Sequence, residues 1–251
     1  LFYVIDNLLF CQANVKLGNS LAVARIRQLD TYRLIPSKYS EGGESVLVQI
    51  ADDDDHLRGI FDLDHATNDR LLAENDRLPG IGVNELVFGV PYYRIINAAF
   101  SHAHPLGSRF NGPDREAWYA GFELETSQAE VAWDKSVELA EIDWMEESIT
   151  YDDYLTDFGG EYHDIRGDAT HKKCLDPNSY VESQMLAETL LGEGASGIIY
   201  PSVRHKDGVC LACFRPALVG NVRKSTRYRF TWTGSPEPEI EFGSSLHLMC
   251  S

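Results

Sequence analysis

The sequence is short of positive charge. Its 251 residues include 22 Lys and Arg against 39 Asp and Glu, which gives a formal net charge of −17. Such a surface repels phosphate backbones and anionic lipids, so we expect neither direct nucleic-acid binding nor membrane binding. Any cluster of arginines in so acidic a chain must serve a local purpose.

Long apolar runs and a regular cysteine framework are also missing. No run approaches the roughly 20 apolar residues that a membrane-spanning helix needs. The five cysteines are an odd number at irregular spacing, which argues against a disulfide scaffold and favours the reducing cytoplasm. The chain begins with Leu1 rather than Met, so a removed signal peptide stays an alternative.

Metal ligands are sparse as well. Cys210 and Cys213 form a lone CxxC inside the apolar run GVCLACF, and no second pair stands at the spacing that a zinc site needs. Two small apolar strand residues are the preferred interpretation. His102 and His104 are read as solvated loop residues, so no metal is expected.

Apolar residues make up 43% of the chain, which is enough for a hydrophobic core. Their arrangement differs between the first third and the rest of the chain. The first third mixes apolar and charged segments. There LAVARIRQL (21–29) predicts a helix, and SVLVQI (45–50) predicts a strand. The run 52–55 is four aspartates, which would favour the N-terminus of a following helix.

From about residue 86 the chain is rich in short β-branched and aromatic segments separated by Gly, Pro and Asp turns. The expected strands are LVFGVPYYRIINAAF, AWYAGF, ESITYDDYL, SGIIYPS, VCLACFRP and TRYRFTWTG. Two helices are expected, at 127–141 and 178–191. Grouped strands with few helices predict an α+β fold. We place the main domain at 86–233, treat 1–85 as a helical or mixed extension packed on it, and treat 234–251 as a tail that could be vector-derived.

One motif is misleading. Gly192, Gly194 and Gly197 match GxGxxG, the dinucleotide-binding fingerprint. That fingerprint works between a strand and the helix that follows it, because the helix N-terminus receives the pyrophosphate. Here the helix comes first and the strand second, so the glycines are read as a helix end and a turn.

A different set of residues suggests chemistry. It combines charged, polar and aromatic side chains from five segments: Arg94, Arg109, Asn111, Tyr119, Glu130, Ser202 and Arg204. Guanidinium groups and a serine can hold a diphosphate, tyrosines offer flat faces to a ring, and one carboxylate can stabilise an oxocarbenium-like transition state. NAD suits this set, because its nicotinamide leaves as a neutral molecule and needs no general acid.

Each member also has an ordinary explanation. The arginines can be surface residues and Ser202 a turn residue. Ser127-x-x-Glu130 matches a capping box, in which the glutamate returns to the amide at the helix start. On spacing alone, this capping role is favoured over catalysis.

The order of YYRIINAAF, GSRFN, AWYAG, SQAEV and GIIYPSVRHKDGVCLACFRP resembles the RES domain family, over roughly 92–231. That family, named for its Arg, Glu and Ser signature residues, comprises toxins of toxin–antitoxin pairs with Xre-like antitoxins. The resemblance implies an ADP-ribosyltransferase-like mixed β core with flanking helices. It also implies consumption of NAD as substrate, by phosphorolysis, by hydrolysis or by transfer of ADP-ribose to a protein.

The resemblance also implies residue roles. Arg109, Tyr119 and Glu130 are similar to the family's catalytic residues. Arg94, in what is expected to be the opening strand, is similar to a phosphate or ribose contact; the other expected contacts are Asn111, Ser202 and Arg204. The long N-terminal segment is a departure from compact members of the family.

Three functions are weighed. The first is an NAD-cleaving toxin that uses phosphate or water as acceptor. The second is a protein mono-ADP-ribosyltransferase, which differs in its acceptor. The third is a non-catalytic NAD-binding or interaction module. The implied partners are NAD, inorganic phosphate and an Xre-like antitoxin, with a homo-oligomer as a further alternative.

Overall fold

The structure is a computed structural model and describes residues 21–40, 80–101 and 103–243. Its strands are β1 (Val23–Pro36), β2 (Trp118–Gly121), β3 (Glu146–Asp164), β4 (Gly197–Pro201), β5 (Val209–Cys213), β6 (Gly220–Thr233) and β7 (Glu239–Phe242). The α-helices are α1 (Ser37–Ser40), α4 (Tyr93–Ser101), α5 (Leu124–Glu141) and α6 (Val181–Gly192). Short 3₁₀ turns are η1 (Val83–Glu85), η2 (Ala169–Leu175) and η3 (Pro216–Leu218). The expected α+β class is confirmed.

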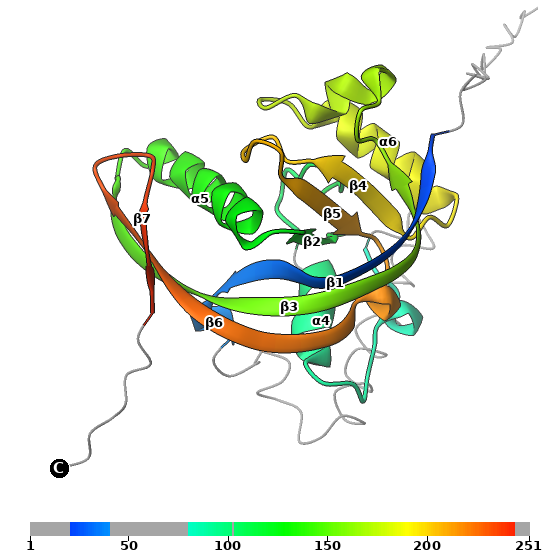
Figure 1. Ribbon diagram of the computed structural model, residues 1–251, viewed down its shortest axis with the longest axis horizontal. Helices are drawn as coiled ribbons and strands as arrows, with labels where there is room; N and C mark the ends of the chain where they lie inside the picture. The colour runs from blue at the N-terminus through cyan, green and yellow to red at the C-terminus, as the bar shows by residue number, and fades with distance from the viewer. Residues whose placement is uncertain (1–20, 41–79, 102, 244–251) are drawn as a thin grey trace, which may run out of the picture.

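The strands form two layers that are joined at both edges, where β1 pairs with β2 and β3 pairs with β4. The seven-stranded order is β1-β2-β5-β4-β3-β6-β7, and β1 also pairs antiparallel with β3 along most of its length. The long strands β1, β3 and β6 therefore curve beneath the short strands β2, β5 and β4 (Figure 1). Helices α5 and α6 lie on the upper side in this view, near the short strands.

The curvature of the long strands has a local cause. The β1–β3 ladder shifts register between Gln28 and Thr31, where Asp30 has a φ of 53°. On β3, Gly160 has a φ of 119° and stands opposite Ile26. A bulge of this kind bends a strand pair and increases its twist. The bend lets the long strands reach both edges of the short ones.

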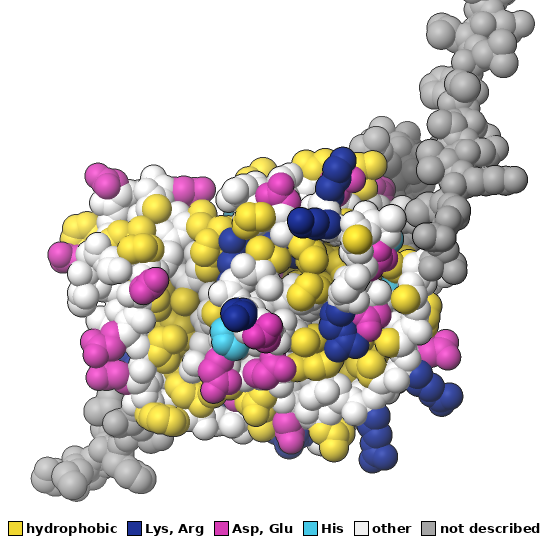
Figure 2. Space-filling model, turned by 45° about the horizontal axis from the view of Figure 1, so that its top comes forward, with side chains coloured by type: hydrophobic (Ala, Val, Ile, Leu, Met, Phe, Trp, Pro, Cys, Tyr) yellow, Lys and Arg dark blue, Asp and Glu magenta, His cyan; other side chains and the backbone are white. Residues whose placement is uncertain are grey.

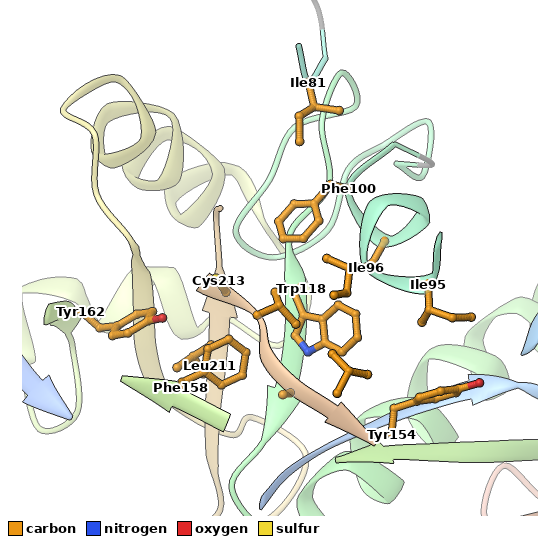
Figure 3. Close-up of a cluster of buried hydrophobic side chains, with 14 of the residues drawn as sticks. Ile81, Ile95, Ile96, Phe100, Trp118, Tyr154, Phe158, Tyr162, Leu211 and Cys213 are labelled. Carbon is orange, nitrogen blue, oxygen red and sulfur yellow. The ribbon is translucent and has the colours of Figure 1, made fainter. Parts of the chain in front are cut away.

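The short strands separate two cores. Alternate side chains of a strand point to opposite faces. Trp118 and Leu211 face the central core with Ile96 and Phe100 of α4, as Figure 3 shows. On the other face lies a second core that α6 covers: Phe110, Ala117, Ile165, Cys174, Ala187, Leu190, Ile198, Tyr200, Cys210, Ala212 and Phe214. The two faces of β2-β5-β4 are thus distinct environments.

A third core holds α5 against the long strands. Leu139 of α5 is buried with Tyr151, Phe230 and Trp232. Ser136 accepts a hydrogen bond of 2.9 Å from the Trp232 indole nitrogen. These contacts fix the rotation of α5 about its axis, and so decide which of its residues face the short strands.

Two predicted elements are wrong in type. The segment 21–29 is not helical, because it enters β1, where exposed and half-buried residues alternate and pair with β3. The segment PYYRIIN is not a strand. It begins α4, because Ile95, Ile96, Ala99 and Phe100 form a buried stripe at helical spacing. In both places tertiary contacts overrode local preference.

The other predicted strands and both predicted helices are present, and the GxGxxG glycines lie between α6 and β4 as expected. The strand predicted at 45–50 and the helix predicted after the aspartate run lie outside the described residues. Part of the predicted tail, β7, pairs with β6. None of the helices that the structure describes is long and apolar enough to cross a membrane.

Candidate active site

The glycine–arginine turn before β2 is pinned to the strand that follows it. Ser108 and Asn111 form an isolated β-bridge. Gly107 has a φ of 69°, and a Cβ there would meet the Asn111 carbonyl oxygen at 2.3 Å, so the turn needs glycine. The Tyr119 hydroxyl accepts from the Phe110 amide at 2.8 Å and donates to Asn111 Oδ1 at 2.7 Å. Tyr119 and Asn111 are thereby joined at one wall of the second core.

The start of α5 is anchored by a serine. Ser127 Oγ accepts from the Gly121 amide at 3.0 Å and donates to the Tyr32 carbonyl at 2.6 Å, which ties the helix to β2 and β1. The helix begins after Glu123, so Ser127 is inside its first turn. The capping-box interpretation of Ser127 and Glu130 is therefore wrong: the serine is committed to the strands, and the glutamate is free of the helix start.

The Glu130 carboxylate instead meets the end of β4. Ser202 Oγ donates to Glu130 Oε1 at 2.6 Å, and the Cys210 thiol approaches the same oxygen at 3.7 Å. Ser202 Oγ in turn accepts from the amides of Arg204 and His205, at 3.1 and 2.9 Å. Because both of its acceptor positions are used, the serine's only hydrogen points at the glutamate. Burial, and then the Glu130 charge, raise the pKa of Cys210 well above its usual value.

Two arginines reach the same region from different loops. Arg109 Nη1 donates to the carbonyl oxygens of Cys174 and Asp176, at 3.1 and 2.8 Å. Arg204 Nη2 donates to the Pro177 carbonyl oxygen at 2.6 Å. The segment 174–177, at the end of η2 and just after it, therefore binds both guanidinium groups. It leaves each of them with further N–H donors, since an arginine has five.

Aromatic rings flank both guanidinium groups. Arg109 lies over the Tyr180 ring at 4.7 Å, and Arg204 lies over the Trp133 ring at 3.1 Å from the centroid. Figure 2 shows Lys and Arg side chains among hydrophobic ones near the middle of this face, with others toward its top and lower right and with Asp and Glu side chains interspersed.

The structure does not bring Arg94 to this cluster. It lies on α4, which packs on the central core across the short strands from Tyr119 and Cys210. There it lines a cavity of about 280 Å³ together with Ser40, Tyr92, Tyr93, Ile95, Tyr154 and Lys224. The remaining six predicted site residues lie on the α5–α6 side. Arg94 was grouped with them because it resembles the arginine of the family's opening strand; in this structure it lies on a helix.

Asp134 is a second carboxylate of α5 near Glu130 that the sequence analysis did not single out. It follows Glu130 by four residues on α5, which places both carboxylates on one helix face. Burial, and then the Glu130 charge, raise the pKa of Asp134 to about 7, whereas Arg204 opposes the rise. Asp134 is nevertheless exposed, so water screens part of these effects. The four-residue spacing was the signal that could have revealed it.

Cys210 and Cys213 are buried strand residues, as interpreted from the sequence, and they face opposite cores. Among the residues that the structure describes, no group of three or more His, Cys, Asp or Glu could hold a metal ion.

Comparison with known proteins identifies a family and similar proteins. The sequence model of the RES domain matches residues 87–233. The chain is similar to the "Uncharacterized protein y4oC" of Sinorhizobium fredii (strain NBRC 101917 / NGR234), with 24% identity over 206 residues, 81% of this chain and 83% of that protein. It is also similar to a chain in the crystal structure of the M. tuberculosis MbcT–MbcA toxin–antitoxin complex, with 11% identity, a TM-score of 0.45, and coverage of 83% of this chain and 87% of that chain.

The RES domain match begins just before α4 and ends with β6, so it includes Arg109, Glu130 and Ser202. It covers more than half of the chain. This protein belongs to the RES domain family.

Proposed function

We propose that this protein cleaves the nicotinamide–ribose bond of NAD and passes ADP-ribose to phosphate or water, which would deplete cellular NAD in the cytoplasm. The observation that carries the proposal is the Glu130 carboxylate, held by a hydrogen bond from Ser202. The charges of Glu130, Arg204 and Arg109 all act on Asp134, so these groups lie in one region of the molecule. A carboxylate fixed in this way suits the positive charge that develops on the ribose carbon as nicotinamide leaves.

The neighbouring groups fit the other parts of NAD. The further N–H donors of Arg109 and Arg204 match the oxygens of a diphosphate. The rings of Tyr119 and Tyr180 are half-buried and offer faces to a heteroaromatic ring. In this proposal Ser202 aims Glu130 rather than binding the diphosphate, because its only hydrogen is used on the carboxylate.

The test is to incubate the purified protein with NAD, with and without phosphate, and to identify the products by mass. ADP-ribose 1″-phosphate would show phosphorolysis, and ADP-ribose would show hydrolysis. A mass increase on protein would instead select the mono-ADP-ribosyltransferase alternative. Release of no nicotinamide under any of these conditions would refute the enzymatic proposal and leave an NAD-binding or interaction module.

We further propose an Xre-like antitoxin as partner, because family membership implies a toxin and an unrestrained NAD consumer would harm its own cell. Co-expression of this protein with the gene beside it should relieve growth arrest, and the two products should co-purify. Overexpression without any effect on growth or on cellular NAD would count against the toxin role. It would leave the chemistry open to the assay above.

A further inference from the structure

Two hydrogen bonds attach the loop between β4 and β5 to α5. One is the bond of 2.6 Å that Ser202 donates to Glu130. The other joins His205 Nδ1 to Thr126 Oγ1 at 3.1 Å. Thr126 and Glu130 are four residues apart and lie on one face of the helix, so the two bonds hold the loop one helical turn apart.

The direction of the His205 bond follows from the partners of Thr126. This threonine is fully buried, and its hydroxyl donates to Glu123 Oε2 at 2.8 Å. A hydroxyl has one hydrogen, so Thr126 Oγ1 can only accept from His205, and Nδ1 carries the hydrogen. Glu123 Oε2 also accepts from the Val209 amide at 3.2 Å, which fixes this carboxylate between α5 and β5.

The close approach of loop and helix depends on Gly208. A Cβ at this position would meet Thr126 Oγ1 at 2.4 Å and His205 Nδ1 at 2.9 Å. The Gly208 carbonyl oxygen accepts from the Ser202 amide at 2.8 Å, and the Gly208 amide donates to the His205 carbonyl oxygen at 3.2 Å. The backbone of the loop is therefore closed on itself and leaves room for the His205 ring against the helix.

The backbone of His205 also sets the direction of the Ser202 hydroxyl. The amides of His205 and Arg204 donate to Ser202 Oγ at 2.9 and 3.1 Å, which leaves the serine hydrogen for Glu130. If His205 moved away from α5, its amide would move with it, and the hydroxyl could rotate away from the carboxylate. Glu130 would then regain the rotamers that a fixed partner denies it.

We propose that His205 is a positioning residue for Glu130. Its side chain holds the loop on α5 through Thr126, and its amide orients the Ser202 hydroxyl that holds the carboxylate. This inference rests on the proposed cleavage of NAD. A charge stabilises a transition state well only when it is fixed in place beforehand, and a displacement of about 1 Å can cost about 10²-fold in rate.

The experiment replaces His205 with three residues that differ in where they place a donor. The amide nitrogen of asparagine takes the position of Nδ1, so His205→Asn keeps the hydrogen bond to Thr126. The amide nitrogen of glutamine takes the position of Nε2, so His205→Gln keeps a polar side chain but misplaces the donor. His205→Ala removes the donor. Lys206→Ala is the matched control, because Lys206 is an exposed residue of the same loop.

The His205 variants are made in the wild-type chain and in Glu130→Gln. Nicotinamide release is measured in single-turnover reactions at saturating NAD, NAD affinity by calorimetry, and the fold by melting curves. A residue that acts through the Glu130 charge loses its effect once that charge is removed. A general loss of shape would instead lower the rate by the same factor in both chains.

We expect His205→Ala and His205→Gln to lower the rate of the wild-type chain by about 10-fold or more, and His205→Asn and the control to stay close to wild type. In Glu130→Gln, His205→Ala should cause no further loss. NAD affinity should change little, because Arg204 is held separately by the Pro177 carbonyl oxygen and the Trp133 ring.

Cleavage by folded His205→Ala at the wild-type rate would overturn the positioning role alone. So would His205→Asn that is no faster than His205→Gln, or an equal loss from His205→Ala with and without the Glu130 charge. Release of no nicotinamide by the wild type, with water or with phosphate, would overturn the proposed function and this inference with it.

Discussion

Replacing Glu130 with glutamine separates its structural role from its chemical one. The amide oxygen of glutamine can still accept the hydrogen bond that Ser202 donates at 2.6 Å. A bond to a charged acceptor is about twice as strong as a neutral one, so the change costs on the order of 1 kcal/mol. For a chain of this size that lowers the melting temperature by roughly 2–4 °C.

The expected catalytic effect is larger. Glutamine carries no negative charge to oppose the cation that develops on the ribose carbon. Loss of one preorganised electrostatic group costs about 10²- to 10³-fold in turnover, or about 2.7–4 kcal/mol. NAD affinity should change little, because a carboxylate contributes nothing favourable to an anionic diphosphate. The two effects thus differ enough in size to be told apart.

The assay is single-turnover nicotinamide release by Glu130→Gln and the wild type, together with melting curves and NAD titration by calorimetry. Glu141→Gln is the control for loss of one acid from α5, because Glu141 is exposed at the end of the same helix. A folded Glu130→Gln protein that cleaves NAD at the wild-type rate would refute the proposed mechanism, and Glu130 would then only bind Ser202 to the helix.

Three further predictions concern binding, pH and backbone geometry. Arg109→Ala should weaken NAD binding in calorimetry by on the order of 1.5–3 kcal/mol, because a charge-assisted contact is lost; unchanged affinity in a folded variant would remove Arg109 from the diphosphate site. Burial raises the pKa of Asp153, a 1% exposed residue, to about 7, so the fold retains a proton that the unfolded chain loses near pH 4. At ~1.36 kcal/mol per pKa unit, urea unfolding should show wild-type stability falling by about 4 kcal/mol relative to Asp153→Asn as the pH rises from 4 to 8; a constant difference would contradict this. Gly197→Ala should destabilise the chain by more than about 1 kcal/mol in the same assay, because φ is 155° and a Cβ would meet the Ala212 carbonyl oxygen at 2.2 Å; an unchanged midpoint would contradict that.

The wrong element types share one cause. The segment 21–29 and the segment around Arg94 have apolar spacing that local patterns can read either way. Pairing with β3 made the first a strand, and packing against Trp118 made the second a helix. Neither partner is near in sequence, so no local pattern could report it.

The amino-acid sequence by itself determined the α+β class, most of the strands, both long helices and the identity of the residues worth testing. Periodicity and residue type are local properties, so they can be read from the sequence without knowledge of the fold. The sequence also explained why arginines stand out, since the chain is so acidic.

Only the tertiary structure decided which side chains meet. Ser202 lies 72 residues from Glu130, and their hydrogen bond requires α5 to be anchored by Ser127 and β4 to pair with β5. The same packing placed Arg94 across the short strands from the other predicted site residues. Side chains that are distant in sequence are brought together by burial of apolar faces and by strand pairing, and these depend on the whole fold.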